Sequence, residues 1–100
     1  MFGMPTFDAI DRFWADYRRL THAQRERFLR ARDLFVEDLQ AGAGFRKSLR
    51  VKGFRGEPGV FEMTWAGDGR ALFRYGESEK DGEAHIIWLR VGTHDIFDRL

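Results

Sequence analysis

The 100-residue sequence predicts a single α+β domain in which two N-terminal helices pack on one face of an antiparallel β-sheet. Three observations predict this class: apolar residues at helical spacing up to residue 41, alternating apolar residues over 60–75, and a mostly apolar run over 85–91. A chain of this length has room for one core, so we expect one domain over residues 1–100. A hydrophobic content of 43% is sufficient for that core.

The first helix is expected over about residues 6–19. Thr6 follows Pro5 and is a suitable N-cap residue, and Asp8 would lie near the positive end of the helix. Apolar residues then recur at helical spacing: Phe7, Ile10, Phe13, Trp14 and Tyr17.

The second helix is expected over about residues 22–41. Thr21 and Gln24 have the spacing of a capping box, and Gly42 and Gly44 follow the last turn. Its apolar stripe consists of Phe28, Ala31, Phe35 and Leu39. Because the connection to the first helix is short, we expect both stripes to pack on the same sheet.

The sheet is expected over about residues 47–97 and begins with a basic, glycine-rich segment that has room for one short strand. Residues 60–75 then form a hairpin. Keeping its apolar residues on one face requires paired residue numbers that sum to an even value, which favours a three-residue loop, Gly67-Asp68-Gly69. This register places Glu62 opposite Arg74.

Residues 85–91 are apolar at successive positions, which suits a central strand. The face that we expect the helices to cover consists of Phe61, Met63, Trp65, Phe73, Tyr75, Ile87 and Leu89. The opposite face then presents Glu62, Thr64, Arg70, Leu72, Arg74, Trp88 and Arg90. That second face is polar and cationic, and any function should lie on it.

Composition excludes several classes of protein. The chain has no cysteine, which excludes disulfides and thiolate metal sites, and its net charge is only +1. The charge is uneven, because residues 45–75 contain seven Lys and Arg against three Asp and Glu. The sequence has no secretory start, no membrane-length apolar run and no glycine-rich phosphate loop, so we expect a cytosolic (cytoplasmic) protein without membrane contact, metal or nucleotide cofactor.

The polar face carries residue types that suit RNA cleavage, which needs a base, a proton donor and fixed positive charge. His94 follows the last strand and is a better candidate than His22 or His85. Each candidate also has a purely structural alternative: a Glu62–Arg74 ion pair, a solvated Arg70 beside a turn, and a second small core around Trp88. Stacking of Trp88 on a base is the functional alternative.

Four runs resemble consecutive blocks of the RelE/ParE superfamily of bacterial toxin–antitoxin toxins: residues 48–53 (Ser-Leu-Arg-Val-Lys-Gly), 59–65 (Gly-Val-Phe-Glu-Met-Thr-Trp), 69–75 (Gly-Arg-Ala-Leu-Phe-Arg-Tyr) and 86–97 (Ile-Ile-Trp-Leu-Arg-Val-Gly-Thr-His-Asp-Ile-Phe). The resemblance covers essentially the whole chain. It implies a RelE-like, microbial-ribonuclease-like sheet and the toxin of a type II toxin–antitoxin system. Toxins of the RelE/HigB-like branch are mRNA interferases, which are endoribonucleases that cleave mRNA. Many members cleave only on the ribosome, and a cognate antitoxin neutralises the toxin.

The resemblance, which matches best at Arg70 and His94, and the residue types of the polar face together give a hypothesis for individual roles. Arg70 would stabilise charge on the phosphorane, His94 would act as acid or base, and Glu62 would assist. The expected RNA-binding residues are Arg50, Lys52, Arg74, Trp88 and Arg90. The expected partners are the antitoxin, mRNA and the ribosome.

One residue favours an alternative. Phe97 stands where many members have a late tyrosine, and a phenyl ring cannot donate a proton. The alternative is a non-catalytic binding module with the toxin fold, or a ParE-like inhibitor of DNA gyrase, since a fold alone does not determine activity.

Overall fold

The strands and helices follow the hydrophobic periods of the sequence and form one layer of helices on one sheet. The computed structural model describes residues 5–78 and 83–94. Its elements are β1 (Thr6–Ala9), α1 (Asp11–Arg19), α2 (His22–Ala41), η1 (Lys47–Leu49), β2 (Lys52–Gly53), β3 (Val60–Thr64), β4 (Gly69–Tyr75) and β5 (His85–Thr93). The strand order is β1-β5-β4-β3-β2, antiparallel except for the parallel pair β1–β5. The predicted α+β class is confirmed.

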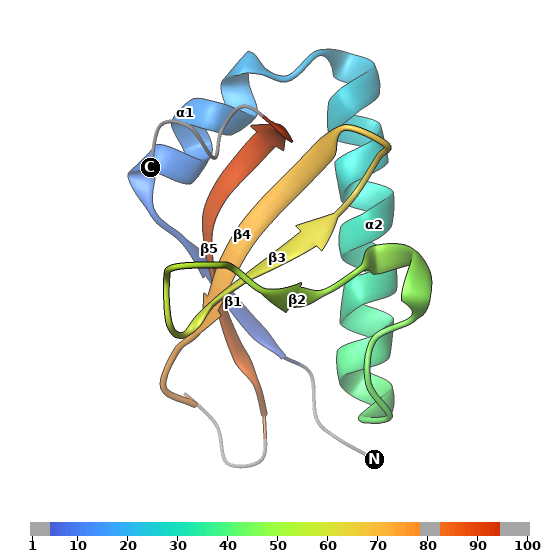
Figure 1. Ribbon diagram of the computed structural model, residues 1–100, viewed down its shortest axis with the longest axis vertical. Coiled ribbons are helices and arrows are strands. Elements are labelled where there is room, and N and C mark those ends of the chain that lie inside the picture. The colour runs from blue at the N-terminus through green and yellow to red at the C-terminus, as the bar shows by residue number, and fades with distance from the viewer. Residues whose placement is uncertain (1–4, 79–82, 95–100) are drawn as a thin grey trace.

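The helices cover one face of this sheet. Figure 1 shows α2 running alongside the strands and α1 beside the C-terminal end of β5. Phe28 and Phe35 of α2 are buried against Trp88, and Phe35 also contacts Phe73 of β4. Within the described residues, the sheet ends at Thr93. The predicted continuation to residue 97, with Phe97, lies outside them.

The prediction that a helix starts at Thr6 is wrong. Residues 6–9 form β1, which pairs in parallel with β5, and the helix begins at Asp11 with Ile10 as N-cap. The Thr6 hydroxyl oxygen lies 2.6 Å from Nδ1 of His85 instead of capping a helix. The edge of β5 offers backbone partners from a distant part of the chain, and this pairing overrides a local helix signal.

The second helix is confirmed, with the bounds that local signals predicted. The Thr21 hydroxyl accepts a hydrogen bond from the Gln24 backbone N–H (3.2 Å), and the Gln24 side chain accepts one from the Thr21 N–H (2.8 Å). Gly42 ends the helix in the left-handed region (φ 69°), which a residue without Cβ adopts at little cost.

The β3–β4 hairpin has the predicted three-residue loop, shifted by one residue. The Trp65 N–H donates to the Gly69 carbonyl (3.1 Å), so Gly69 belongs to the strand and the loop is 66–68. Glu62 therefore lies opposite Leu72. The predicted pairing of Glu62 with Arg74 is wrong. The physical reason is that the Trp65 indole covers Gly69, where a Cβ would overlap the ring.

The predicted face assignment of β5 is also wrong. Trp88 is 5% exposed and packs in the aromatic core, whereas Ile87 and Leu89, which we expected there, are only partly buried. The pairing with β4 shifts register between Leu72 and Phe73, whose partners are Arg90 and Trp88. A strand that is apolar on both faces carries no period-two signal to select the buried face.

Arg90, the register partner of Leu72, is also buried and is not exposed on the polar face as expected. Its Nε lies 2.6 Å from Oδ2 of Asp16 in α1, and both side chains are less than a tenth exposed. The same carboxylate oxygen accepts a hydrogen bond from the Val91 N–H (3.2 Å). β1 ends at Ala9, so the backbone of β5 beyond Trp88 has no strand partner on that edge among the described residues. The Asp16 carboxylate bonds to this part of β5 instead and holds α1 against the sheet.

Candidate functional site

The sheet face away from the helices brings several of the predicted residues together. Lys52 of β2 is the register partner of Glu62 in β3, and Lys52 Nζ lies 3.2 Å from Glu62 Oε1. Thr64 is the register partner of Arg70 in β4. Adjacent rows of a sheet thus place an ammonium, a carboxylate, a hydroxyl and a guanidinium side by side.

Arg70 is held by the hairpin loop beside it. Its Nη1 donates to the backbone carbonyls of Gly69 (2.9 Å), Ala66 (3.3 Å) and Gly67 (3.4 Å). These acceptors are neutral, and no carboxylate in the described part of the chain forms an ion pair with Arg70. The guanidinium therefore has a fixed position, and its positive charge can pair with an anionic ligand.

Two adjoining pockets open around these side chains. The smaller has a volume of about 310 Å³ and the larger about 700 Å³, and Lys52, Glu62 and Arg70 line both. Arg50 and Thr64 line the smaller pocket, together with Val51. His94, which is exposed just after β5, lines the larger pocket with Gly53, Phe54 and Arg55. We call the two pockets together the cationic cleft.

Arg50 reaches the cationic cleft through an unusual backbone conformation. It ends η1 with φ 46°, the one positive φ of a non-glycine residue in the described segments. Its N–H donates to the Lys47 carbonyl (3.0 Å), which holds the turn. Left-handed conformations are unfavourable for residues with a Cβ and tend to persist at functional positions.

The other predicted RNA-binding residues lie elsewhere. Arg74 is exposed in β4 opposite Val60 and Ile87, and it lines neither pocket. Trp88 and Arg90 are buried, as described above. The structure therefore separates these three residues from the cationic cleft.

Phe54 is a lining residue that sequence reasoning missed. It directly follows β2, and its N–H donates to the Val60 carbonyl (2.7 Å) across the β2–β3 hairpin. From the glycines and basic residues, the sequence predicts only a basic segment over residues 45–59 with room for one short strand. A hairpin interpretation of that segment would have placed Phe54 opposite Val60, on the same face as Lys52 and Glu62.

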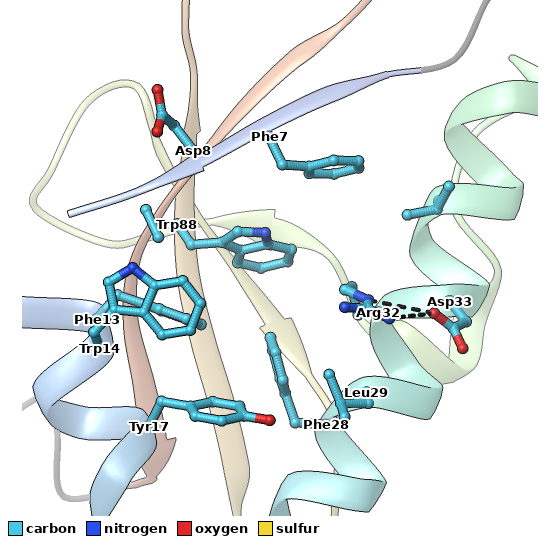
Figure 2. Close-up of a pocket in the computed structure, with 12 residues that line it drawn as sticks. Phe7, Asp8, Phe13, Trp14, Tyr17, Phe28, Leu29, Arg32, Asp33 and Trp88 are labelled. Atoms are coloured by element: carbon cyan, nitrogen blue, oxygen red, sulfur yellow. Dashed lines mark hydrogen bonds and ion pairs between the residues drawn. The ribbon is translucent and has the colours of Figure 1, made fainter. Parts of the chain in front are cut away.

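A third pocket, of about 700 Å³, lies on the helix side between β1, α1 and α2 (Figure 2). We call it the aromatic groove; its aromatic lining residues are Phe7, Phe13, Trp14, Tyr17, Phe28 and Trp88. Trp14 is 47% exposed and Phe7 is 40% exposed, so large apolar surfaces meet solvent here. In Figure 2, Phe7 points into the groove and Asp8 points away from it.

Clusters that could bind a metal and helices that could span a membrane are both absent from the described residues. No group of three or more His, Asp or Glu side chains in 5–78 and 83–94 could hold a metal ion. In the same ranges, no helix is both long enough and apolar enough to cross a membrane.

The sequence matches no known family model and no curated protein. Solved structures, in contrast, share the fold. A chain of the E. coli DinJ–YafQ toxin–antitoxin complex aligns with a TM-score of 0.69 at 10% identity, over 94% of this chain and 97% of that one.

Two archaeal complexes give the same result. The RelB–RelE antitoxin–toxin complex from Methanococcus jannaschii aligns with a TM-score of 0.61 at 17% identity, over 93% of this chain and 98% of that one. The RelE–RelB complex from Pyrococcus horikoshii OT3 aligns with a TM-score of 0.59 at 19% identity, over 92% and 97%. The resemblance predicted from the sequence motifs is thus confirmed for the fold.

Proposed function

We propose that this chain, which has the fold of RelE/ParE toxins, is the toxin of a type II toxin–antitoxin pair and an endoribonuclease that cleaves mRNA. The cationic cleft carries this proposal. It combines Arg70, Lys52, Glu62 and His94 on the one sheet face that the helices leave open. Fold alone does not specify activity, whereas this set of side chains has the groups that RNA cleavage needs.

The proposed reaction is attack of a ribose 2′-hydroxyl on the adjacent phosphate. The new O–P bond forms as the bond to the 5′-oxygen breaks, which leaves a 2′,3′-cyclic phosphate. Glu62, a carboxylate beside Lys52, accepts the 2′-hydroxyl proton, and His94 donates a proton to the leaving 5′-oxygen. Arg70 stabilises the negative charge that accumulates on the phosphate oxygens.

Backbone binding is assigned to the cations at the rim of the cationic cleft. Arg50 and Lys52 flank Val51 in the chain. Both line the smaller pocket and are exposed to solvent. Phosphate contacts of this kind position the RNA without reading its sequence. They predict RNA affinity that falls as the salt concentration rises.

We further propose that an antitoxin covers the aromatic groove. Exposed apolar surface of this kind, with Trp14 and Phe7 roughly half exposed, is typical of a protein-binding site. The groove lies on the helix side of the sheet and the cationic cleft on the other side. An antitoxin could therefore bind firmly to one side while a further segment reaches the other.

The alternative remains a non-catalytic binding module or a ParE-like gyrase inhibitor. The observation that favours it is Phe97, which lacks the hydroxyl of the tyrosine found in many relatives and lies outside the described residues. The two functions differ in their products, which are cut transcripts in one case and altered DNA supercoiling in the other.

The test is induction of the chain in a bacterial host, with mapping of transcript ends and measurement of plasmid supercoiling. We expect new transcript ends with the wild type and with Arg74→Ala, and none with Arg70→Ala or His94→Ala. Arg74→Ala is a matched control because it removes an arginine from the same strand outside the cationic cleft. Transcript cuts that survive both cleft substitutions would refute the site, and altered supercoiling without cuts would support the gyrase alternative.

A further inference from the structure

A cleft that binds RNA can contact bases as well as phosphates. Trp88, which the sequence suggested for stacking on a base, is not exposed to do so. Trp88 is 5% exposed within the core. Among the described residues that line the cationic cleft, Phe54 is the one phenyl ring. Its side chain is partly exposed.

The backbone of Phe54 is well fixed. Its N–H donates to the Val60 carbonyl (2.7 Å), and its own carbonyl accepts from the Glu57 N–H (3.2 Å). Gly56 and Gly59 adopt φ values of 88° and 82°, which close the turn at little cost for residues without Cβ. A ring on such a turn loses little conformational entropy when it binds a ligand.

The neighbours of Phe54 determine which ligand suits it. The larger pocket is lined by three cations, Lys52, Arg55 and Arg70, and by one acidic residue, Glu62. Proteins that bind single-stranded nucleic acid combine an excess of positive charge with an aromatic ring. The cations contact the phosphates, and a base stacks on the ring. Bases of a duplex are stacked on one another and cannot offer a free face to the ring.

We propose that Phe54 stacks on one unpaired base of the RNA and so places the adjoining phosphate at Arg70. Phe54 is therefore a residue that binds and positions the substrate, and the cleft selects unpaired RNA. This inference rests on the proposed ribonuclease function, but its test is a binding measurement that does not require cleavage.

The experiment measures binding of the full chain to a single-stranded RNA of about ten nucleotides that carries 2′-O-methyl groups and cannot be cut. We expect Phe54→Ala and Phe54→Leu to weaken binding about tenfold and Phe54→Trp to retain it, because stacking requires an aromatic face and not merely an apolar one. Phe7→Ala is the matched control, since it removes an exposed ring from the aromatic groove.

A second arm keeps the wild-type protein and replaces one nucleotide at a time by an abasic one. We expect one position at which the missing base weakens binding to the wild type but causes no further loss in Phe54→Ala. This arm still tests the inference where a Phe54 variant folds poorly, because a wild type without any sensitive position overturns it.

Several results would overturn the inference: Phe54→Ala and Phe54→Leu that bind like the wild type, a Phe54→Trp variant as weak as Phe54→Ala, or a wild type with no sensitive position. Binding that depends on Phe54 without cleavage of the unmodified RNA would remove the ribonuclease proposal and leave this inference standing. A wild type that binds no RNA would overturn this inference, while the mapping of transcript ends would still decide the ribonuclease proposal.

Discussion

The ion pair between Asp16 and Arg90 fastens α1 to the sheet, and its removal tests the fold described here. We expect Asp16→Ala to lower the free energy of unfolding by about 3–5 kcal/mol, the usual cost of leaving a buried charge without its partner. The variant loses two bonds from Arg90, at 2.6 and 3.1 Å, and one from the Val91 N–H at 3.2 Å. Nη1 of Arg90 already has no hydrogen-bond partner among the described residues, so little else would hold the guanidinium.

The assay is equilibrium urea denaturation followed by circular dichroism. With a slope of about 1.5 kcal/mol per molar urea, this cost lowers the midpoint by about 2–3 M, a large part of the stability of a domain of this size. Asp33→Ala is the matched control, because it removes an exposed carboxylate from an ion pair with Arg32 and should cost less than about 1 kcal/mol. An Asp16→Ala variant as stable as Asp33→Ala would refute the reasoning.

The double variant Asp16→Ala/Arg90→Leu separates a stranded charge from lost packing. Removing both charges leaves no unpaired ion, so we expect it to be more stable than Asp16→Ala alone. A double variant that is no more stable than the single one would show that the burial of charge is not the cause.

Three further predictions concern single features. Gly69→Ala should destabilise the hairpin by about 1–3 kcal/mol in urea denaturation, because its methyl group would overlap the Trp65 indole. The hydrogen bond from Arg46 holds the pKa of Asp38 below its ordinary value of 3.8, so its stabilisation is present above that pH and is lost as the pH falls further. The stability difference between wild type and Asp38→Asn should therefore shrink below about pH 4 in denaturation series. Trp14→Ala should lower the affinity for the proposed antitoxin at least about tenfold by calorimetry, while the proposed RNA cleavage persists.

Each of these predictions has a contradicting result. Gly69→Ala with wild-type stability would mean that the indole does not cover that glycine. A constant difference between wild type and Asp38→Asn down to pH 2–3 would remove the Arg46 bond as its cause. Antitoxin affinity unchanged in Trp14→Ala would place the partner away from the aromatic groove.

Local signals predicted the parts of the fold that local contacts determine. The Thr21–Gln24 capping box and Gly42 act within one or two turns, so the sequence alone placed α2 correctly. Residues 6–9 became a strand because β5, almost eighty positions later, offers an edge to pair with. No pattern within a short window contains that information.

The same distinction applies to the candidate site. Alternation along β3 and β4 placed Glu62 and Arg70 on the open face, and the structure gathers them with Lys52 and His94 around the cationic cleft. Trp88 was assigned to the wrong face because its strand is apolar on both sides and has an irregular register with β4. Phe54 required the β2–β3 pairing, which a glycine-rich segment does not reveal by itself.

The central claim is that the cationic cleft cleaves RNA, and the most direct test is kcat/KM of the purified chain on RNA with Arg70→Ala beside Arg74→Ala. Ribosomes are supplied in a parallel reaction. We predict a loss of about 10²–10³-fold for Arg70→Ala, since it removes charge aimed at the reacting phosphate, and near wild-type cleavage for Arg74→Ala. Equal rates for the two variants, whether both fast or both slow, would contradict the account.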